Sequence, residues 1–113
     1  MGKADLPQGT LDLLILKVVA LEPLHGYAIG QRLEQVSHGV VRVQQGSLYP
    51  ALHRLEKKGS LSGVWKASDT GRSAKFYSVT RAGQRELERG QMSWERLAET
   101  VALILRSSTR GTR

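Results

Sequence analysis

Hydrophobic residues recur at intervals of three and four along most of the chain, which is the spacing typical of helices with one buried face. The helices that this pattern predicts cover residues 6–21, 27–36, 46–58 and 80–107. The first helix would turn five apolar side chains inward, namely Leu11, Leu14, Ile15, Val18 and Val19. Pro23 disfavours helical backbone in the residue before it, so we expect a break between the first two helices there. After the second helix, the Val40–Val43 run predicts a short strand.

The third predicted helix has two different faces. At about 100° per residue, one narrow arc is apolar and holds Leu48, Ala51, Leu52 and Leu55. The opposite side carries Tyr49, Pro50, His53, Arg54 and Lys57. Ser47 suits the N-cap position of this helix, and Gly59 suits the residue that ends it. The pattern leaves two interpretations open: an ordinary amphipathic surface helix, and a helix whose polar face reads DNA.

Two segments that follow this helix predict a β-hairpin. Residues 61–67 and 74–79 are rich in β-forming side chains, and residues 68–72 between them contain Asp69 and Gly71, as closing turns do. A helix followed at once by a basic hairpin is typical of the winged-helix arrangement. We therefore expect an α+β fold, mostly α, of the winged helix-turn-helix type.

The long fourth helix carries a heptad pattern. Leu87, Trp94 and Val101 are spaced by seven, and Leu97 and Ile104 occupy intervening positions. Such a repeat is short for a free coiled coil, but it is sufficient for a helix that packs on a partner helix. We interpret residues 80–107 as a C-terminal dimerisation helix, followed by a disordered basic tail at 108–113.

Charge is distributed unevenly along the sequence, whose formal net charge is +7. Residues 40–80 hold seven Lys or Arg against two acidic residues, whereas residues 1–39 hold three against four. The excess of positive charge therefore peaks over the third helix and the hairpin. That is where a nucleic-acid-binding surface is expected.

Several classes of site are disfavoured by composition. The sequence contains no cysteine, which excludes disulfides, thiolate metal sites and thiolate nucleophiles. The three histidines, His25, His38 and His53, do not follow a metal-ligand spacing, and no nucleophile motif or phosphate-binding glycine motif occurs. We therefore expect neither an enzyme nor a cofactor. The start of the sequence lacks an export signal, and the most apolar run, Leu11–Leu21, is too short for a membrane span, so we expect a cytoplasmic protein with no membrane partner.

With these elements in place, the sequence resembles the PadR family of bacterial winged-helix transcriptional regulators over nearly its whole length. The matching blocks are residues 13–16, His25-Gly26-Tyr27, residues 46–52 with Arg54-Leu55-Glu56, Trp65, Gly71-Arg72 with Lys75 and Tyr77, and residues 80–83. Each block alone is weak, but their joint order and spacing is specific. A single helix after the hairpin is similar to the short members of the family.

The resemblance implies a homodimer that binds double-stranded DNA at a pseudo-palindromic operator, usually as a repressor released by a small molecule. Residues 1–79 would form the DNA-binding domain and residues 80–107 the dimer helix. Within the DNA-binding domain, residues 46–58 would be the recognition helix and residues 61–79 the wing. Two such recognition helices would lie about one DNA turn apart, roughly 34 Å. The alternative function is a winged-helix adaptor whose basic face binds an acidic protein partner.

Eight residues are the candidates for DNA contact: Ser47, Tyr49, His53, Arg54, Lys57, Lys58, Arg72 and Lys75. Arg54 suits a bidentate contact to guanine, whereas Lys57 and Lys58 suit phosphates. Tyr49, His53, Arg54 and Lys57 could each instead be an ordinary solvated surface residue, and Tyr49 could instead brace the third helix against the second. Arg72 and Lys75 suit phosphate contact at the wing, and the alternative for them is a charged turn that keeps the hairpin soluble. We expect Trp65 to pack in the core or the hairpin, and His25 to cap the second helix.

A second candidate set lies on the fourth helix and comprises Leu87, Trp94, Leu97, Ala98, Val101 and Ile104. In a two-fold dimer, the two Trp94 side chains would approach each other near the axis. One interpretation is a plain hydrophobic dimer contact. The other is that the paired indoles, with Leu97, Ala98 and Val101, line a slot for a planar apolar effector, as some short members of the family look built to do.

Overall fold

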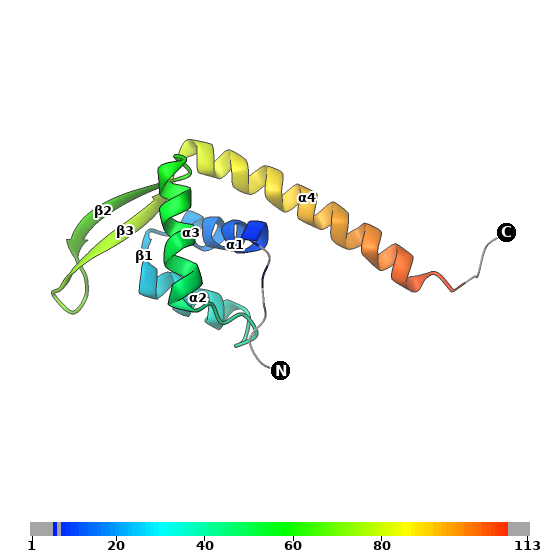
Figure 1. Ribbon diagram of the computed structural model, residues 1–113, viewed down its shortest axis with the longest axis horizontal. Helices are drawn as coiled ribbons and strands as arrows, with labels where there is room; N and C mark the ends of the chain where they lie inside the picture. Colours follow the sequence, from blue (N-terminus) through cyan, green and yellow to red (C-terminus); the bar gives the residue numbers. More distant parts are fainter. Residues whose placement is uncertain (1–5, 7, 109–113) are drawn as a thin grey trace.

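A computed structural model of the protein describes residue 6 and residues 8–108. It contains four helices, α1 (Gln8–Leu21), α2 (Gly26–Val36), α3 (Gln45–Lys57) and α4 (Arg81–Arg106). It also contains three strands, β1 (Leu24–His25), β2 (Leu61–Ala67) and β3 (Ser73–Val79). The order of elements confirms the expected winged helix-turn-helix with a long C-terminal helix (Figure 1).

The sheet is antiparallel, with β3 between β1 and β2. The β2–β3 hairpin, Leu61–Val79, projects beyond the helices and is called the wing below (Figure 1). Its register runs from the Leu61–Val79 pair at the base to the Ala67–Ser73 pair near the tip. In the closing turn, the Ser68 backbone N–H donates to the Arg72 carbonyl at 2.7 Å, and Gly71 adopts a φ of 86°, which favours glycine.

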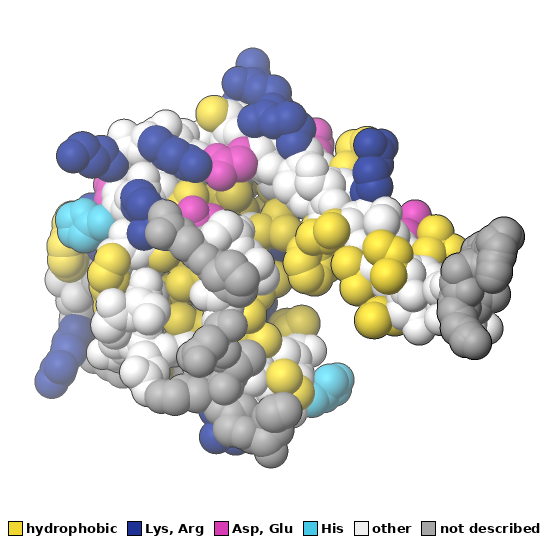
Figure 2. All heavy atoms as spheres, turned by 45° about the vertical axis from the view of Figure 1, so that its right-hand side comes forward, with side chains coloured by type: hydrophobic (Ala, Val, Ile, Leu, Met, Phe, Trp, Pro, Cys, Tyr) yellow, Lys and Arg dark blue, Asp and Glu magenta, His cyan; other side chains and the backbone are white. Residues whose placement is uncertain are grey.

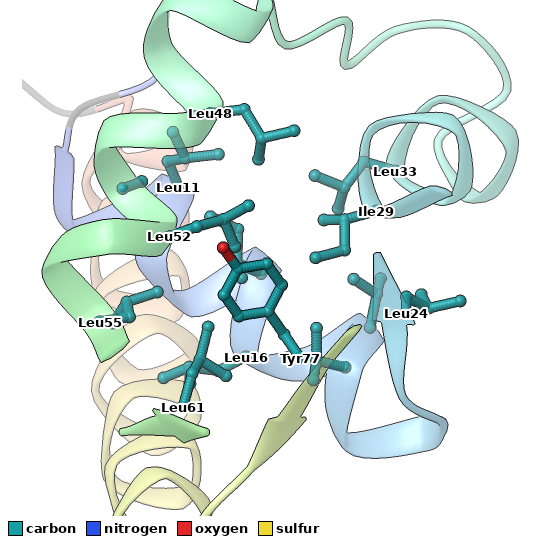
Figure 3. Packing of buried hydrophobic residues seen from close by; sticks show 14 of the residues in the cluster. Leu11, Leu16, Leu24, Ile29, Leu33, Leu48, Leu52, Leu55, Leu61 and Tyr77 are labelled. Carbon is teal, nitrogen blue, oxygen red and sulfur yellow. The ribbon is translucent and has the colours of Figure 1, made fainter. Parts of the chain in front are cut away.

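The hydrophobic core lies where α1 meets α2, α3 and the base of the wing. Leu16 of α1, Ile29 of α2, and Leu52 and Leu55 of α3 are buried, and the Tyr77 ring of β3 lies among them (Figure 3). The predicted inward residues of α1 are buried except Leu14, which is half-buried. The leucines of α3 anchor this helix in the core, and the opposite side of α3 faces outward.

Two helix starts follow from capping side chains. Nδ1 of His25 accepts a hydrogen bond from the Ala28 backbone N–H at 3.2 Å, which confirms the expected cap of α2. Thr80 caps α4 in the same way, because its Oγ1 accepts from the Gly83 backbone N–H at 3.0 Å. The prediction for Ser47 was wrong: α3 begins earlier, with extended Gln44 as its N-cap, so Ser47 lies inside the first turn.

The strand predicted over Val40–Val43 is also wrong. This segment has no regular structure, although Val41 and Val43 pack against the core. The Val41 backbone N–H donates to the Ser37 hydroxyl at 2.8 Å and so needs no partner strand. The sheet is extended instead by β1, which was not predicted and pairs Leu24 with Tyr77.

Helix α4 changes character along its length. Its first turns pack on the core through Gly83 and Leu87, and Leu13 of α1 lies against Gly90. From there to its end the helix extends away from the rest of the chain (Figure 1), and every residue from 91 to 101 is exposed. No helix in the described part of the chain is both long and apolar enough to cross a membrane.

Candidate nucleic-acid interface

The outward side of α3 presents three polar side chains. Tyr49, His53 and Lys57 are spaced by four and are all exposed, while the leucines on the other side are buried. Ser47 is exposed in the first turn of the same helix. The hydrophobic pattern predicts these three residues on this side, and an α-helix exposed in this way is an element that a DNA major groove admits.

Arg54 does not share this face. Its guanidinium turns toward α1, where Nη2 donates to the Asp12 carboxylate at 2.7 Å. The two side chains are 39% and 15% exposed, and Nε of Arg54 is buried without a hydrogen-bond partner in the described residues. The structure therefore favours an anchoring role for Arg54 over the base-reading role predicted from the helix pattern.

Lys58 is also engaged within the protein. Its Nζ lies 3.0 Å from Glu86 of α4, and the same carboxylate accepts a hydrogen bond of 2.6 Å from the Ser60 hydroxyl. Burial alone would raise the pKa of Glu86, but the bonds from Ser60 and Lys58 outweigh it and lower this pKa below its ordinary value. Lys58 thus ties the end of α3 to α4, which weakens its case as a phosphate ligand.

Lys75 links the wing to α3. Its Nζ donates to Glu56 at 2.8 Å, and this bond raises the pKa of Lys75. The lysine stem crosses Gly63 of β2, where an added Cβ would lie 2.5 Å from Cε of Lys75. Because residue 63 is glycine, the Lys75 side chain has room to pass over β2 and reach Glu56 of α3.

The remaining cations of the basic region face outward. Lys57, Lys66 and Arg72 form no ion pair with any residue that the structure describes, and all three are exposed. Nζ of Lys66 lies 4.6 Å from the centre of the Phe76 ring, and Arg72 follows the turn at the tip of the wing. Exposed Lys and Arg side chains gather over the upper part of the molecule in Figure 2.

Tyr49 rests on α2. An added Cβ at Gly26 would lie 2.6 Å from Cε1 of the Tyr49 ring, so the ring occupies the space that a larger residue would fill. The side chain is nevertheless 40% exposed. Tyr49 therefore braces α3 against α2, as one of the two interpretations held, and still presents one edge outward.

Two predictions about hydrophobic residues are wrong. Trp65 is not packed in the core: it is 66% exposed, because β2 continues beyond the core after Gly63. Leu87, expected at a dimer contact, is 4% exposed and packs in the core of its own chain. Heptad spacing placed Leu87 with the partner-facing residues of α4, but Leu87 belongs to the hydrophobic core of its own chain.

The other members of that set remain open to a partner. Trp94, Leu97, Ala98, Val101 and Ile104 are exposed along one side of α4 and are called the apolar stripe below. Hydrophobic side chains gather on the projecting part of this helix in Figure 2.

Comparison with known proteins agrees with this geometry. Residues 15–89 match the PadR-like family, which is described as a family of transcriptional regulators. The chain belongs to the PadR-like family. It is accordingly a DNA-binding regulator of transcription and not an enzyme.

Individual relatives support the same assignment. A transcriptional regulator from Mycobacterium tuberculosis is 36% identical over 97 residues, which cover 86% of this chain and 87% of that protein. The crystal structure of a PadR-like transcriptional regulator from Bacillus cereus superposes with a TM-score of 0.78 at 34% identity, covering 89% of this chain and 96% of that one. An uncharacterised 37.1 kDa protein of a Streptomyces fradiae transposon is 43% identical over 90 residues. These residues make up 80% of this chain and 24% of that larger protein.

Proposed function

We propose that this PadR-like regulator is a dimeric repressor that binds a pseudo-palindromic operator through the outward side of α3 and through the wing. The observation that carries the proposal is the arrangement of free cations. Within the basic region of residues 40–80, ion pairs engage Arg42, Arg54, Lys58 and Lys75, whereas Lys57, Lys66 and Arg72 have no ionic partner in the described residues. These three lie on α3 and the wing, the two elements that would meet DNA.

The division of roles within the interface follows from the same contacts. Tyr49, His53 and Lys57 would face the major groove, and Arg72 would meet phosphate at the tip of the wing. Arg54, Lys58 and Lys75 are bound to carboxylates and would hold α3 in place. Such a regulator would act in the cytoplasm, where its DNA target lies.

Dimerisation is proposed to use the apolar stripe of α4. An exposed row of Trp, Leu, Val and Ile side chains is unfavourable in water, and burial against the same row of a second copy would remove it from solvent. Two copies related by a two-fold axis would set their recognition helices about one DNA turn apart. A symmetric dimer then requires a pseudo-palindromic site.

Selection of bound sites from random double-stranded DNA tests this function. We expect a palindromic consensus, and we expect Lys57→Ala and Arg72→Ala each to weaken binding and to reduce its salt dependence by about one counterion. Lys17→Ala is the matched control, because Lys17 is an exposed cation of α1 outside the proposed contacts. Salt-insensitive binding to an acidic protein, with only weak DNA binding, would support the adaptor function instead.

The effector is proposed to be a flat, apolar molecule held between the two Trp94 indoles of the dimer. Trp94 is 50% exposed in the described chain, so its ring is available on the apolar stripe. Titration with planar hydrophobic compounds should quench or shift tryptophan emission and should lower DNA affinity. Unchanged fluorescence together with unchanged DNA affinity would reduce the role of Trp94 to a dimer contact.

A further inference from the structure

Trp65 lies on the inward-facing side of the wing but beyond the core. Cross-strand partners share one face of a sheet, and side chains alternate along a strand. Gly63 is paired with the buried Tyr77, and Trp65, two residues further out, is paired with Lys75. Trp65 therefore belongs to the same face as Tyr77. The hairpin extends beyond the hydrophobic core at this point, so the indole lines a hollow between the wing and α3.

That space is a groove of about 950 Å³. The start of α2, the outward side of α3 and the inner face of the wing supply its walls. Its main side chains are Tyr27, Tyr49, His53, Trp65, Arg72 and Lys75. Three of these are aromatic and largely open to solvent, with exposed fractions of 58% for Tyr27, 40% for Tyr49 and 66% for Trp65. We call this hollow the wing groove.

The wing groove combines aromatic rings with charged side chains at both of its ends. Lys75 and Glu56 neutralise each other at its inner end, and Arg72 lies at its outer end without an ionic partner in the described residues. The acidic residue at the wing tip, Asp69, also borders the groove. A strand of duplex DNA suits this lining, because its deoxyribose rings are apolar and its phosphates are anionic.

We propose that one strand of the operator lies in the wing groove and that Trp65 packs its indole against a deoxyribose there, as a further binding residue. This inference rests on the proposed DNA-binding function. It explains why the wing carries an exposed tryptophan on its inner face: the indole is covered only in the complex.

The experiment uses the full chain and a 25-base-pair duplex that carries the selected operator. In the Trp94→Phe variant, used once sedimentation velocity and duplex titration show the oligomeric state and affinity of the wild type, Trp65 is the single tryptophan, and saturating duplex should shield it from acrylamide quenching and shift its emission to the blue. In the wild-type background, Trp65→Ala should weaken duplex binding about tenfold, because the apolar surface that the indole buries against the sugar is lost. Trp65→Phe should retain part of the affinity.

Val64→Ala is the matched control. Val64 adjoins Trp65 on the same strand, is 59% exposed, and points to the opposite face, so its loss should leave duplex binding unchanged. The urea midpoint of Trp65→Ala should equal that of the wild type, because an exposed indole contributes little to folding.

The outcomes separate this inference from the proposed function. Tight, palindrome-specific binding with Trp65 still quenchable and with Trp65→Ala unaffected would overturn the inference and leave the function intact. No duplex binding by the wild type, with Trp65 shielded only by an acidic protein, would overturn both. If Trp65→Ala does not fold, shielding of the native indole and the affinity of Trp65→Phe decide the question.

Discussion

Arg54 joins α3 to α1, and its removal should cost stability before it affects base recognition. Arg54→Ala would leave the Asp12 carboxylate, 15% exposed, without its 2.7 Å partner, and we expect a loss of about 2 kcal/mol in the free energy of unfolding, measured in urea. Lys57→Ala should change this free energy by less than about 0.5 kcal/mol while weakening DNA binding. Unchanged stability of Arg54→Ala, with discrimination between operator and random DNA lost, would restore the base-reading role.

A double-mutant cycle isolates the pair itself. If the two side chains act through each other, Asp12→Ala combined with Arg54→Ala should cost less than the sum of the single changes. Additive losses would instead mean that each residue is stabilised by separate neighbours.

At the scale of residues, the sequence predicted burial well and partners poorly. Leu48, Leu52 and Leu55 could be assigned to the core because their spacing alone places them on one side of a helix. The partner of Arg54 could not be assigned, since Asp12 lies 42 positions away and no local pattern connects the two. The same holds for Glu56 with Lys75 and for Glu86 with Lys58. Charged residues predicted to face DNA were therefore partly structural.

At the scale of elements, the joint between α3 and α4 depends on close backbone contact at Gly83. An added Cβ there would overlap the carbonyl oxygen of Ser60, and this oxygen is fixed because it also accepts from the Thr80 backbone N–H at 3.1 Å. We expect Gly83→Ala to destabilise the protein by about 2 kcal/mol in urea unfolding. Gly46→Ala is the control: nothing lies within 4 Å of its added Cβ, so it should be neutral or slightly stabilising. Equal unfolding midpoints for the two variants would contradict a tight joint.

The same joint should respond to acid. The pKa of Glu86 is lowered in the folded protein, so its bonds to Ser60 and Lys58 stabilise the fold above the unfolded-state pKa. This stabilisation is lost as the pH falls from about 5 through the lowered pKa of the folded state. Denaturant unfolding at a series of pH values should therefore show a shallower acid decline for Glu86→Gln than for the wild type. Parallel curves would exclude Glu86 as a contributor.

The elements themselves were largely predictable. Helical periodicity and β-forming segments gave all four helices and the wing, because each of these elements is long enough to bury a regular face. The strand expected over Val40–Val43 is absent because Val41 and Val43 pack on the core from irregular backbone. Strand β1 was not predicted, because two residues are too few to show the alternation of apolar and polar positions that marks a strand. Only its pairing with β3 defines it.

At the scale of the whole molecule, a single chain is elongated and leaves the distal part of α4 without packing partners in the described residues. Its principal extents are 65 × 32 × 21 Å, and its radius of gyration is 16.9 Å, against about 13 Å for a compact chain of this length. The excess comes from the distal half of α4, which packs on nothing in the described residues (Figure 1). The heptad pattern predicted a partner for this helix, but it assigned Leu87 to that partner because spacing alone does not distinguish contacts within a chain from contacts between chains.

Charging the middle of the apolar stripe should therefore separate the two copies. Val101→Glu would bury a carboxylate in the proposed interface, and we expect sedimentation velocity to show a monomer whose affinity for the palindrome falls toward that for a single half-site. Leu103→Glu is the matched control, since Leu103 is also exposed but lies about 200° further around α4, away from the stripe. It should remain dimeric and bind the palindrome normally. Were Val101→Glu to stay dimeric while Leu103→Glu became monomeric, the interface would lie on the opposite face of the helix, and the half-site spacing argued from the stripe would no longer hold.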